Sequence, residues 1–217
     1  MSTTDIAYHV ETGPSPWTVV PLHATGGDEH QLVPLARHLV PGAAVVAPRG
    51  TVMEDGHIRR FFRRRSVTDL DIDDLKERTD EHAASLRQQL AEHGRDPRRV
   101  VAVGYSNGAN VAVTMLLRHP DLLAGAVLLR PMLPYTPDAN PDLAGVRVLV
   151  AAGEGDPFSS PEMTAALAGL LRDSGAAVEV SVQPGGHQVG QGDFDVAQAW
   201  VAGLMAGEPE GAPRDGR

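Results

Sequence analysis

The sequence contains no cysteine among its 217 residues. The protein therefore has no disulfide framework, no thiolate metal site and no cysteine nucleophile, and any covalent chemistry must use another side chain. A chain without cysteine is compatible with a reducing compartment, so we expect the protein in the cytoplasm.

Positive charge and long apolar segments are also scarce. The chain carries 19 Lys and Arg against 28 Asp and Glu, and its net charge of -9 at pH 7 repels phosphate backbones. Nucleic acid is therefore not an expected partner. No segment approaches the roughly 18 consecutive apolar residues of a membrane-spanning helix, and the N-terminus lacks the basic flank and apolar run of a signal peptide. We expect a soluble protein without a membrane span or a targeting segment.

Strand-like and helix-like segments alternate along the chain, without an internal repeat. Apolar runs over 17–22 and 43–47 predict two strands, and the helical spacing of apolar residues over 29–40 places a helix between them. The same order continues, with strands predicted over 99–103, 125–129, 147–151 and 178–183 and helices over 69–93, 107–118, 161–174 and 194–206. This alternation predicts an α/β fold with a mostly parallel central sheet and helices on both faces. We expect one domain over 1–206 and a disordered tail over 207–217.

The segment VVAVGYSNGANV, which begins at Val100, combines a predicted strand, a serine between two glycines and a helix start. Sites form at the carboxyl ends of parallel strands, and Ser106 lies directly after such an end. In this context the pattern G-x-S-x-G is typical of a nucleophile elbow, in which Gly104 and Gly108 avoid side-chain clashes in the tight turn. Ser106 could instead serve only as a helix cap, but capping does not require both glycines. We predict that Ser106 is a nucleophile.

A serine nucleophile needs a base and an orienting carboxylate. Of the nine histidines, His187 is the best placed, because it follows the last predicted strand in the glycine-rich segment PGGHQVG. Asp156 follows the strand over 147–151 and is preferred as the acid to its close rival Glu154, although an aspartate before Pro157 could also be a simple turn residue. The chain order Ser106, Asp156, His187 is that of the α/β hydrolases.

Acyl transfer also needs two N–H donors for the oxyanion. The residue after the serine supplies one, which is the backbone N–H of Asn107. The second must come from another loop, and the loop over 23–27 follows a predicted strand and is rich in small residues. Within it we choose the N–H of Thr25. His23 is expected to hydrogen-bond this loop and to border the substrate pocket.

Six segments, spread over 17–200, resemble the phospholipase/carboxylesterase family of small α/β hydrolases, which includes bacterial carboxylesterases and acyl-protein thioesterases. They are LHATGGDEHQLVPLARHL, APRGTVMEDGHIRRFFRR, VGYSNGANVA, VLLRPMLP, VLVAAGEGDPF and GGHQ, in the order of the family. The resemblance implies the α/β-hydrolase fold, the triad of Ser106, Asp156 and His187, and the same two N–H donors. One departure is Ala24, where the family usually has glycine. If that position needs a positive φ, a methyl group there shifts the oxyanion loop.

Five arginines at 59, 60, 63, 64 and 65 surround Phe61 and Phe62. Guanidinium groups bind carboxylates well, so the cluster could hold an anionic substrate. Pairing with the acids at 69, 71, 73 and 74 is the interpretation that we favour, because charge runs usually form solvated faces. Phe61, Phe62 and Tyr105 are expected to border the substrate pocket, and the two phenylalanines could equally be core residues.

The combined features predict a serine hydrolase that cleaves small or medium carboxylic esters or thioesters through an acyl-enzyme. We expect no metal, nucleotide or organic cofactor, a small-molecule ester as substrate and no large lid, because the short chain leaves little room for one. A homodimer is suggested by analogy with the family alone. Two alternatives remain open, a non-catalytic small-molecule sensor on the same fold and cofactor-free lyase chemistry with the same serine and histidine.

Overall fold

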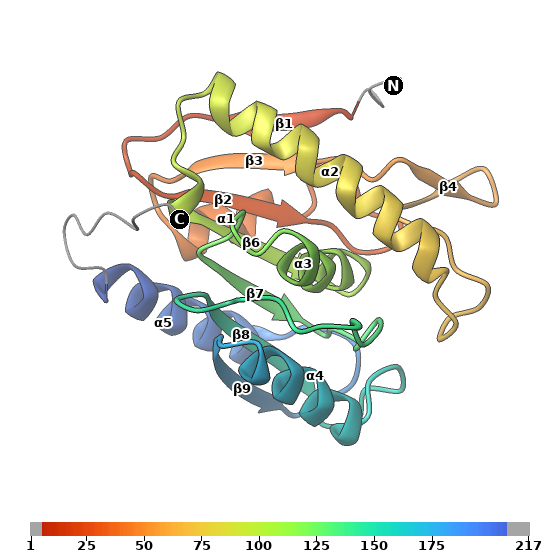
Figure 1. Cartoon of the computed structure of the whole chain (residues 1–217). Coiled ribbons are helices and arrows are strands. Elements are labelled where there is room, and N and C mark those ends of the chain that lie inside the picture. The colour runs from red at the N-terminus through yellow and green to blue at the C-terminus, as the bar shows by residue number, and fades with distance from the viewer. Residues whose placement is uncertain (1–5, 208–217) are drawn as a thin grey trace.

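The computed structural model describes residues 6–207, so the tail expected over 207–217 lies outside it apart from Gly207. Seven strands form the central sheet in the order β1-β3-β2-β6-β7-β8-β9 (Figure 1). Neighbouring strands are parallel except β1 and β3, which are antiparallel. The strands of the sheet are β1 (Tyr8–Glu11), β2 (Thr18–Leu22), β3 (Ala44–Pro48), β6 (Val100–Tyr105), β7 (Gly125–Leu129), β8 (Arg147–Gly153) and β9 (Ala177–Gln183).

Helices pack on both faces of this sheet (Figure 1). Apolar residues of α2, α3 and α4 form one core with one face, and those of α1 and α5 form a second core with the other. The predicted fold class, a mostly parallel sheet covered on both sides, is confirmed. The helices are α1 (Val33–Leu39), α2 (Ile72–Glu92), α3 (Asn107–Arg118), α4 (Pro161–Asp173) and α5 (Gln191–Ala206), and a 3-10 turn (Pro97–Arg99) precedes β6.

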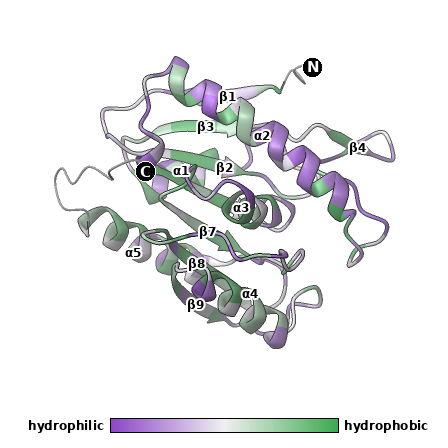
Figure 2. Ribbon diagram, viewed as in Figure 1, coloured by the Kyte–Doolittle hydropathy of each residue, from purple (hydrophilic) through white to green (hydrophobic). Residues whose placement is uncertain are grey.

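The strand β6 shows why the central strands read as continuous apolar runs. Val100 and Ala102 point into the core under α2, α3 and α4, whereas Val101 and Val103 point into the core under α1 and α5. All four are fully buried, so neither face of the strand tolerates a polar side chain. In Figure 2 the central strands are largely green, which marks hydrophobic residues, whereas the ribbon of α2 in front of the sheet is largely purple, which marks hydrophilic residues.

Two features of the fold were not predicted. The edge strand β1 pairs antiparallel with β3, and its four residues are only partly buried, so it lacks a clear apolar pattern. The strands β4 (Val52–Glu54) and β5 (Ile58–Arg60) form a separate antiparallel hairpin. Both features depend on pairing between strands, which a short segment by itself does not reveal.

Three helix starts also differ from the prediction. The helix expected over 69–93 begins at Ile72, because Asp71 is its N-cap. The helix expected over 29–40 begins only at Val33, with a proline in its first turn. The helix expected over 194–206 begins at Gln191, because the Asp193 carboxylate accepts a hydrogen bond from the Gly190 N–H at 2.9 Å and so caps the first turn. Between residues 6 and 207, no helix combines the length and apolar character needed to cross a membrane.

Candidate active site

Ser106 sits on a strained turn between β6 and α3. Its φ of 53° and ψ of -109° place it outside the regions that non-glycine residues usually adopt. A Cβ on Gly104 would lie 2.6 Å from the Gly108 carbonyl oxygen, and one on Gly108 would lie 2.0 Å from the Leu22 carbonyl oxygen. Both glycines are therefore required by close backbone packing. Ser106 occupies the N-cap position of α3, but its side chain makes no capping hydrogen bond.

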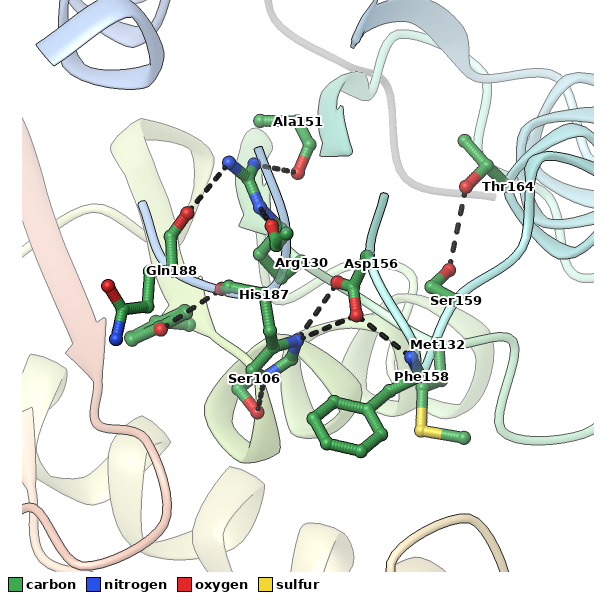
Figure 3. Close-up of polar contacts among 12 residues, drawn as sticks. Ser106, Arg130, Met132, Ala151, Asp156, Phe158, Ser159, Thr164, His187 and Gln188 are labelled. Carbon is green, nitrogen blue, oxygen red and sulfur yellow. Dashed lines mark hydrogen bonds and ion pairs between the residues drawn. The ribbon is translucent and has the colours of Figure 1, made fainter. Parts of the chain in front are cut away.

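The side chain of Ser106 instead contacts His187, which in turn contacts Asp156 (Figure 3). The Ser106 Oγ and His187 Nε2 atoms are 2.8 Å apart. His187 Nδ1 lies 2.9 Å from Asp156 Oδ2 and 3.1 Å from Oδ1, and Asp156 Oδ1 also accepts the Phe158 N–H at 2.9 Å. This network fits a neutral imidazole that donates from Nδ1 to the buried carboxylate and accepts the serine proton at Nε2. The alternative acid Glu154 is exposed to solvent.

The three residues come from loops at one end of the sheet. Ser106 follows β6, Asp156 follows β8 and His187 follows β9, and the carboxyl ends of these parallel strands lie at the same edge. The ring of Phe158 packs edge-on against the His187 ring, with centroids 4.8 Å apart. Sequence reasoning missed Phe158, although its position two residues after the aspartate was a usable signal.

The loop after β2 carries the second expected N–H donor. Thr25 and Asn107 both line the cleft that contains Ser106 and His187. Among the described residues, the non-glycine residues with positive φ are Asp55, Ser106 and Arg130, so Ala24 is not one of them. The Ala24 N–H donates to Gln31 Oε1 at 2.8 Å. The alanine therefore fits this loop without the backbone strain that a required positive φ would cause.

His23 is a structural residue of this loop. It is buried, its Nδ1 donates to the Ala24 carbonyl at 2.8 Å, and its Nε2 accepts the Gly50 N–H at 2.9 Å. Burial lowers the pKa of His23, which favours the neutral ring that these two hydrogen bonds require. The expected hydrogen bond to the loop is present, but His23 does not line the cleft.

The cleft has a volume of about 380 Å³ and Tyr105 lies on its wall, as expected. The expectation that Phe61 and Phe62 also border it is wrong. Both rings are fully buried in the core, and neither lines the cleft. Phe61 stacks on His23 with ring centroids 4.4 Å apart and packs edge-on against His82 at 5.0 Å. The two phenylalanines of this strongly basic segment therefore belong to the hydrophobic core.

The arginine cluster divides between the two interpretations. Arg63 pairs with Asp74 at 3.4 Å and Arg65 with Asp69 at 3.8 Å, as the favoured interpretation expects. Arg59 instead donates to the Gly50 carbonyl at 2.9 Å. The carboxylate of Asp71 accepts the Asp74 N–H and caps α2, so it is not an arginine partner.

Arg60 and Arg64 are the two members of the cluster that line the cleft. Arg64 makes a bidentate pair with Glu54 at 2.9 and 3.0 Å, and Arg60 lies 3.8 Å from the same carboxylate. Arg60 Nη1 also donates to Thr25 Oγ1 at 2.7 Å. Burial and the neighbouring Arg64 lower the pKa of Arg60 to about 10, so it is still protonated at neutral pH. Two guanidinium groups thus share one carboxylate beside the loop that carries Thr25.

A parallel sheet with helices on both faces and a serine, a histidine and an aspartate on three of its loops is the architecture of an α/β hydrolase. The chain belongs to the dienelactone hydrolase family, whose model matches residues 45–188. It is a hydrolase of the dienelactone hydrolase and carboxylesterase type.

Three related proteins support this assignment. The chain is 42% identical over 190 residues to the "Putative hydrolase MhqD" of Bacillus subtilis (strain 168). The aligned residues cover 88% of this chain and 94% of the relative. The crystal structure of a Bacillus cereus carboxylesterase matches with a TM-score of 0.89 and 36% identity, over 94% of this chain and 96% of that chain. A carboxylesterase from Mesorhizobium loti matches with a TM-score of 0.86 and 34% identity, over 94% and 97% of the two chains.

Proposed function

We propose that this protein is a serine hydrolase that cleaves carboxylic esters or thioesters of small to medium acyl groups through an acyl-enzyme. The observation that carries the proposal is the line of contacts from Ser106 Oγ to His187 Nε2 at 2.8 Å and from His187 Nδ1 to Asp156 at 2.9 Å. This line ends on a strained elbow that opens into the cleft. Strain held at a cleft is frequent where a nucleophile must be presented to a substrate.

The first half-reaction forms the acyl-enzyme. Ser106 Oγ attacks the carbonyl carbon while its proton passes to His187 Nε2, and Asp156 stabilises the imidazolium through the hydrogen bond at Nδ1. The carbonyl oxygen becomes an oxyanion, which accepts hydrogen bonds from the N–H groups of Thr25 and Asn107. When the tetrahedral intermediate collapses, His187 returns the proton to the departing alcohol or thiol, and the acyl group stays on Ser106.

The second half-reaction uses water. His187 takes a proton from a water molecule as its oxygen attacks the acyl carbon, and the same oxyanion site holds the second intermediate. Collapse breaks the bond to Ser106 Oγ, which recovers its proton from His187, and the carboxylic acid is released. No step needs a metal or an organic cofactor.

The size of the site supports the proposed substrate class. A cleft of about 380 Å³ is at the small end of the range for ligand pockets, which suits a short acyl chain and a compact leaving group. We further propose that the enzyme acts as one domain over 1–206 and in the cytoplasm, where a chain without cysteine needs no disulfide. A homodimer remains a proposal by family analogy.

The decisive experiment is fluorophosphonate labelling together with hydrolysis of p-nitrophenyl acetate and butyrate. Wild type, Ser106→Ala and His187→Ala are compared, with Ser181→Ala on β9 as the control serine. We expect labelling and turnover in the wild type and in Ser181→Ala, and neither in Ser106→Ala. A folded wild type that neither labels nor turns over ester would favour a ligand sensor. Labelling without release of acid from any ester would favour lyase chemistry.

A further inference from the structure

Arg130 is a buried arginine at the end of β7 (Figure 3). Its side chain reaches the loop over 184–190 that carries His187, which we call the histidine loop. Its guanidinium makes five hydrogen bonds. Nε donates to the Gly186 carbonyl at 2.9 Å, and Nη1 donates to the Ala151 carbonyl at 3.1 Å. Nη2 donates to the Gln188 carbonyl at 3.1 Å. The remaining two bonds join Nη1 and Nη2 to the two carboxylate oxygens of Asp193, at 2.7 and 2.8 Å.

These contacts hold the backbone on both sides of His187. Arg130 binds the carbonyls of residues 186 and 188, and Tyr105 donates its hydroxyl proton to the carbonyl of His187 at 3.1 Å. Three consecutive carbonyls of the loop are therefore fixed by side chains from the ends of β6 and β7. These strands are neighbours in the sheet, and β6 also leads into the Ser106 turn. The histidine loop and the serine turn are thus both attached to the ends of these two neighbouring strands.

The backbone of this loop packs closely against the end of β8. A Cβ on Gly153 would lie 2.2 Å from the Gly186 carbonyl oxygen and 3.0 Å from Arg130 Nε. Arg130 itself adopts a positive φ of 54°, which costs conformational energy in a residue with a side chain. Strain and close packing at the same point indicate that the surrounding structure enforces the direction of this side chain.

Although Arg130 borders the cleft, its guanidinium hydrogen-bonds to protein atoms and has no donor left for a substrate. A guanidinium has five N–H donors, and all five are used by the contacts above. Its charge is balanced by Asp193, which is 2% exposed and also caps the start of α5 through the Gly190 N–H. Buried ion pairs stabilise a fold weakly, because desolvation offsets much of the attraction. Stability alone is therefore a poor explanation for this pair.

We infer that Arg130, supported by Asp193, is the positioning residue for His187, because it fixes the loop that keeps Nε2 on Ser106 and Nδ1 on Asp156. The inference rests on the proposed function, in which His187 is the base. Proton transfer needs this geometry to within fractions of an ångström, and a misplacement of about 1 Å can cost about 100-fold in rate.

Two variants test the inference. Arg130→Lys keeps the charge but offers three N–H donors in place of five, without the planar fork that binds Asp193. The double variant Arg130→Met/Asp193→Leu removes both charges together, so that no unpaired buried charge remains. In both variants we expect kcat for p-nitrophenyl butyrate to fall about 10- to 100-fold, with KM changed less than about 2-fold. The low-field proton resonance of the His187 imidazole, observed by NMR, should weaken or shift in parallel.

Arg147→Lys is the matched control, because Arg147 also donates to a backbone carbonyl, that of Gly203 at 2.8 Å, but does not line the cleft. It should keep the wild-type kcat and resonance. A folded double variant with wild-type kcat and an unchanged His187 resonance would overturn the inference. If the wild type itself turns over no ester, the proposed function fails. The resonance then still decides the positioning role, which requires it in the wild type and its loss in Arg130→Lys.

Discussion

Gly108 lies so close to the end of β2 that a Cβ on it would be 2.0 Å from the carbonyl oxygen of Leu22. The same Cβ would be 2.6 Å from the carbonyl oxygen of His23, which begins the loop that carries Thr25. The glycine therefore brings the first turn of α3, with Asn107, against the loop that carries Thr25. Two segments more than 80 residues apart in the sequence can pack this closely because residue 108 has no side chain.

Gly108→Ala is expected to damage both stability and activity. The added methyl meets backbone atoms that have no free volume, so the free energy of unfolding should fall by about 1–3 kcal/mol. Fluorophosphonate labelling should slow sharply, because α3 must move away from the loop of Thr25. Urea denaturation and labelling rates measure the two effects.

Gly169→Ala provides the control for this change. Gly169 lies inside α4, and a Cβ there would meet no atom within 4 Å beyond its chain neighbours and the nearby backbone of its own helix. Alanine is a better helix former than glycine, so the free energy of unfolding of this variant should rise by about 0.5–1 kcal/mol. Its labelling rate should stay that of the wild type. Equal behaviour of the two variants would show that packing at Gly108 is not decisive.

Phe62 and Phe158 should respond differently to the same substitution. Phe62 is fully buried in the core, whereas Phe158 lines the cleft beside His187. Phe62→Leu should lower the free energy of unfolding by about 1 kcal/mol with little change in KM, since the lost contacts lie in the core. Phe158→Leu should change KM or kcat several-fold at nearly unchanged stability. Steady-state kinetics and urea denaturation of both variants check this, and the reverse pattern would restore Phe62 as a pocket wall.

His82 predicts a loss of stability in acid. It is buried at 1% exposure, and burial, together with the nearby His23 and Arg78, lowers its pKa to about 3. The unfolded chain binds this proton near pH 6.5, so between these pH values the unfolded state holds more protons and stability falls as the pH falls. At pH 5 the histidine should cost about 2 kcal/mol relative to pH 7.5.

His82→Leu tests this assignment, because leucine fills a similar volume and cannot titrate. Urea denaturation gives the free energy of unfolding of both proteins at pH 7.5 and pH 5.0. The difference between the variant and the wild type should shift in favour of the variant by about 2 kcal/mol as the pH is lowered. Parallel pH dependence in the two proteins would mean that His82 accepts its proton without unfolding.

Arg60 and Arg64 predict a preference for anionic esters. In a chain with net charge -9, no carboxylate of the described residues lines the cleft, and these two guanidinium groups share only Glu54. The p-nitrophenyl monoester of glutaric acid should therefore react with a higher kcat/KM than p-nitrophenyl pentanoate. Arg64→Gln should reduce that ratio several-fold at low salt, because the local positive charge falls.

Arg63→Gln is the control for this charge effect. Arg63 is exposed and pairs with Asp74, and it does not line the cleft. Its loss should leave the ratio of the two esters nearly unchanged. A wild type that prefers the neutral ester would show that the positive charge of Arg60 and Arg64 does not contribute to substrate binding.

The sequence by itself determined the order along the chain of the six parallel strands of the main sheet and of the helices between them. Central parallel strands are buried on both faces, so they appear as continuous apolar runs such as the one that begins at Val100. The G-x-S-x-G turn is likewise local, because steric limits act on neighbouring residues. Sequence order also predicted that Ser106, Asp156 and His187 would meet, since the carboxyl ends of parallel strands share one edge of the sheet.

Only the tertiary structure decided which side chains face the cleft. Phe61 and Arg60 are adjacent in the sequence, yet Phe61 is core and Arg60 lines the cleft, because the direction of each side chain depends on what packs against this segment. The ion pair of Arg130 and Asp193 joins residues 63 positions apart, and the sequence around each residue does not predict its partner. Periodicity records which face of an element is buried, whereas polar contacts between loops exist only once the sheet has brought them together.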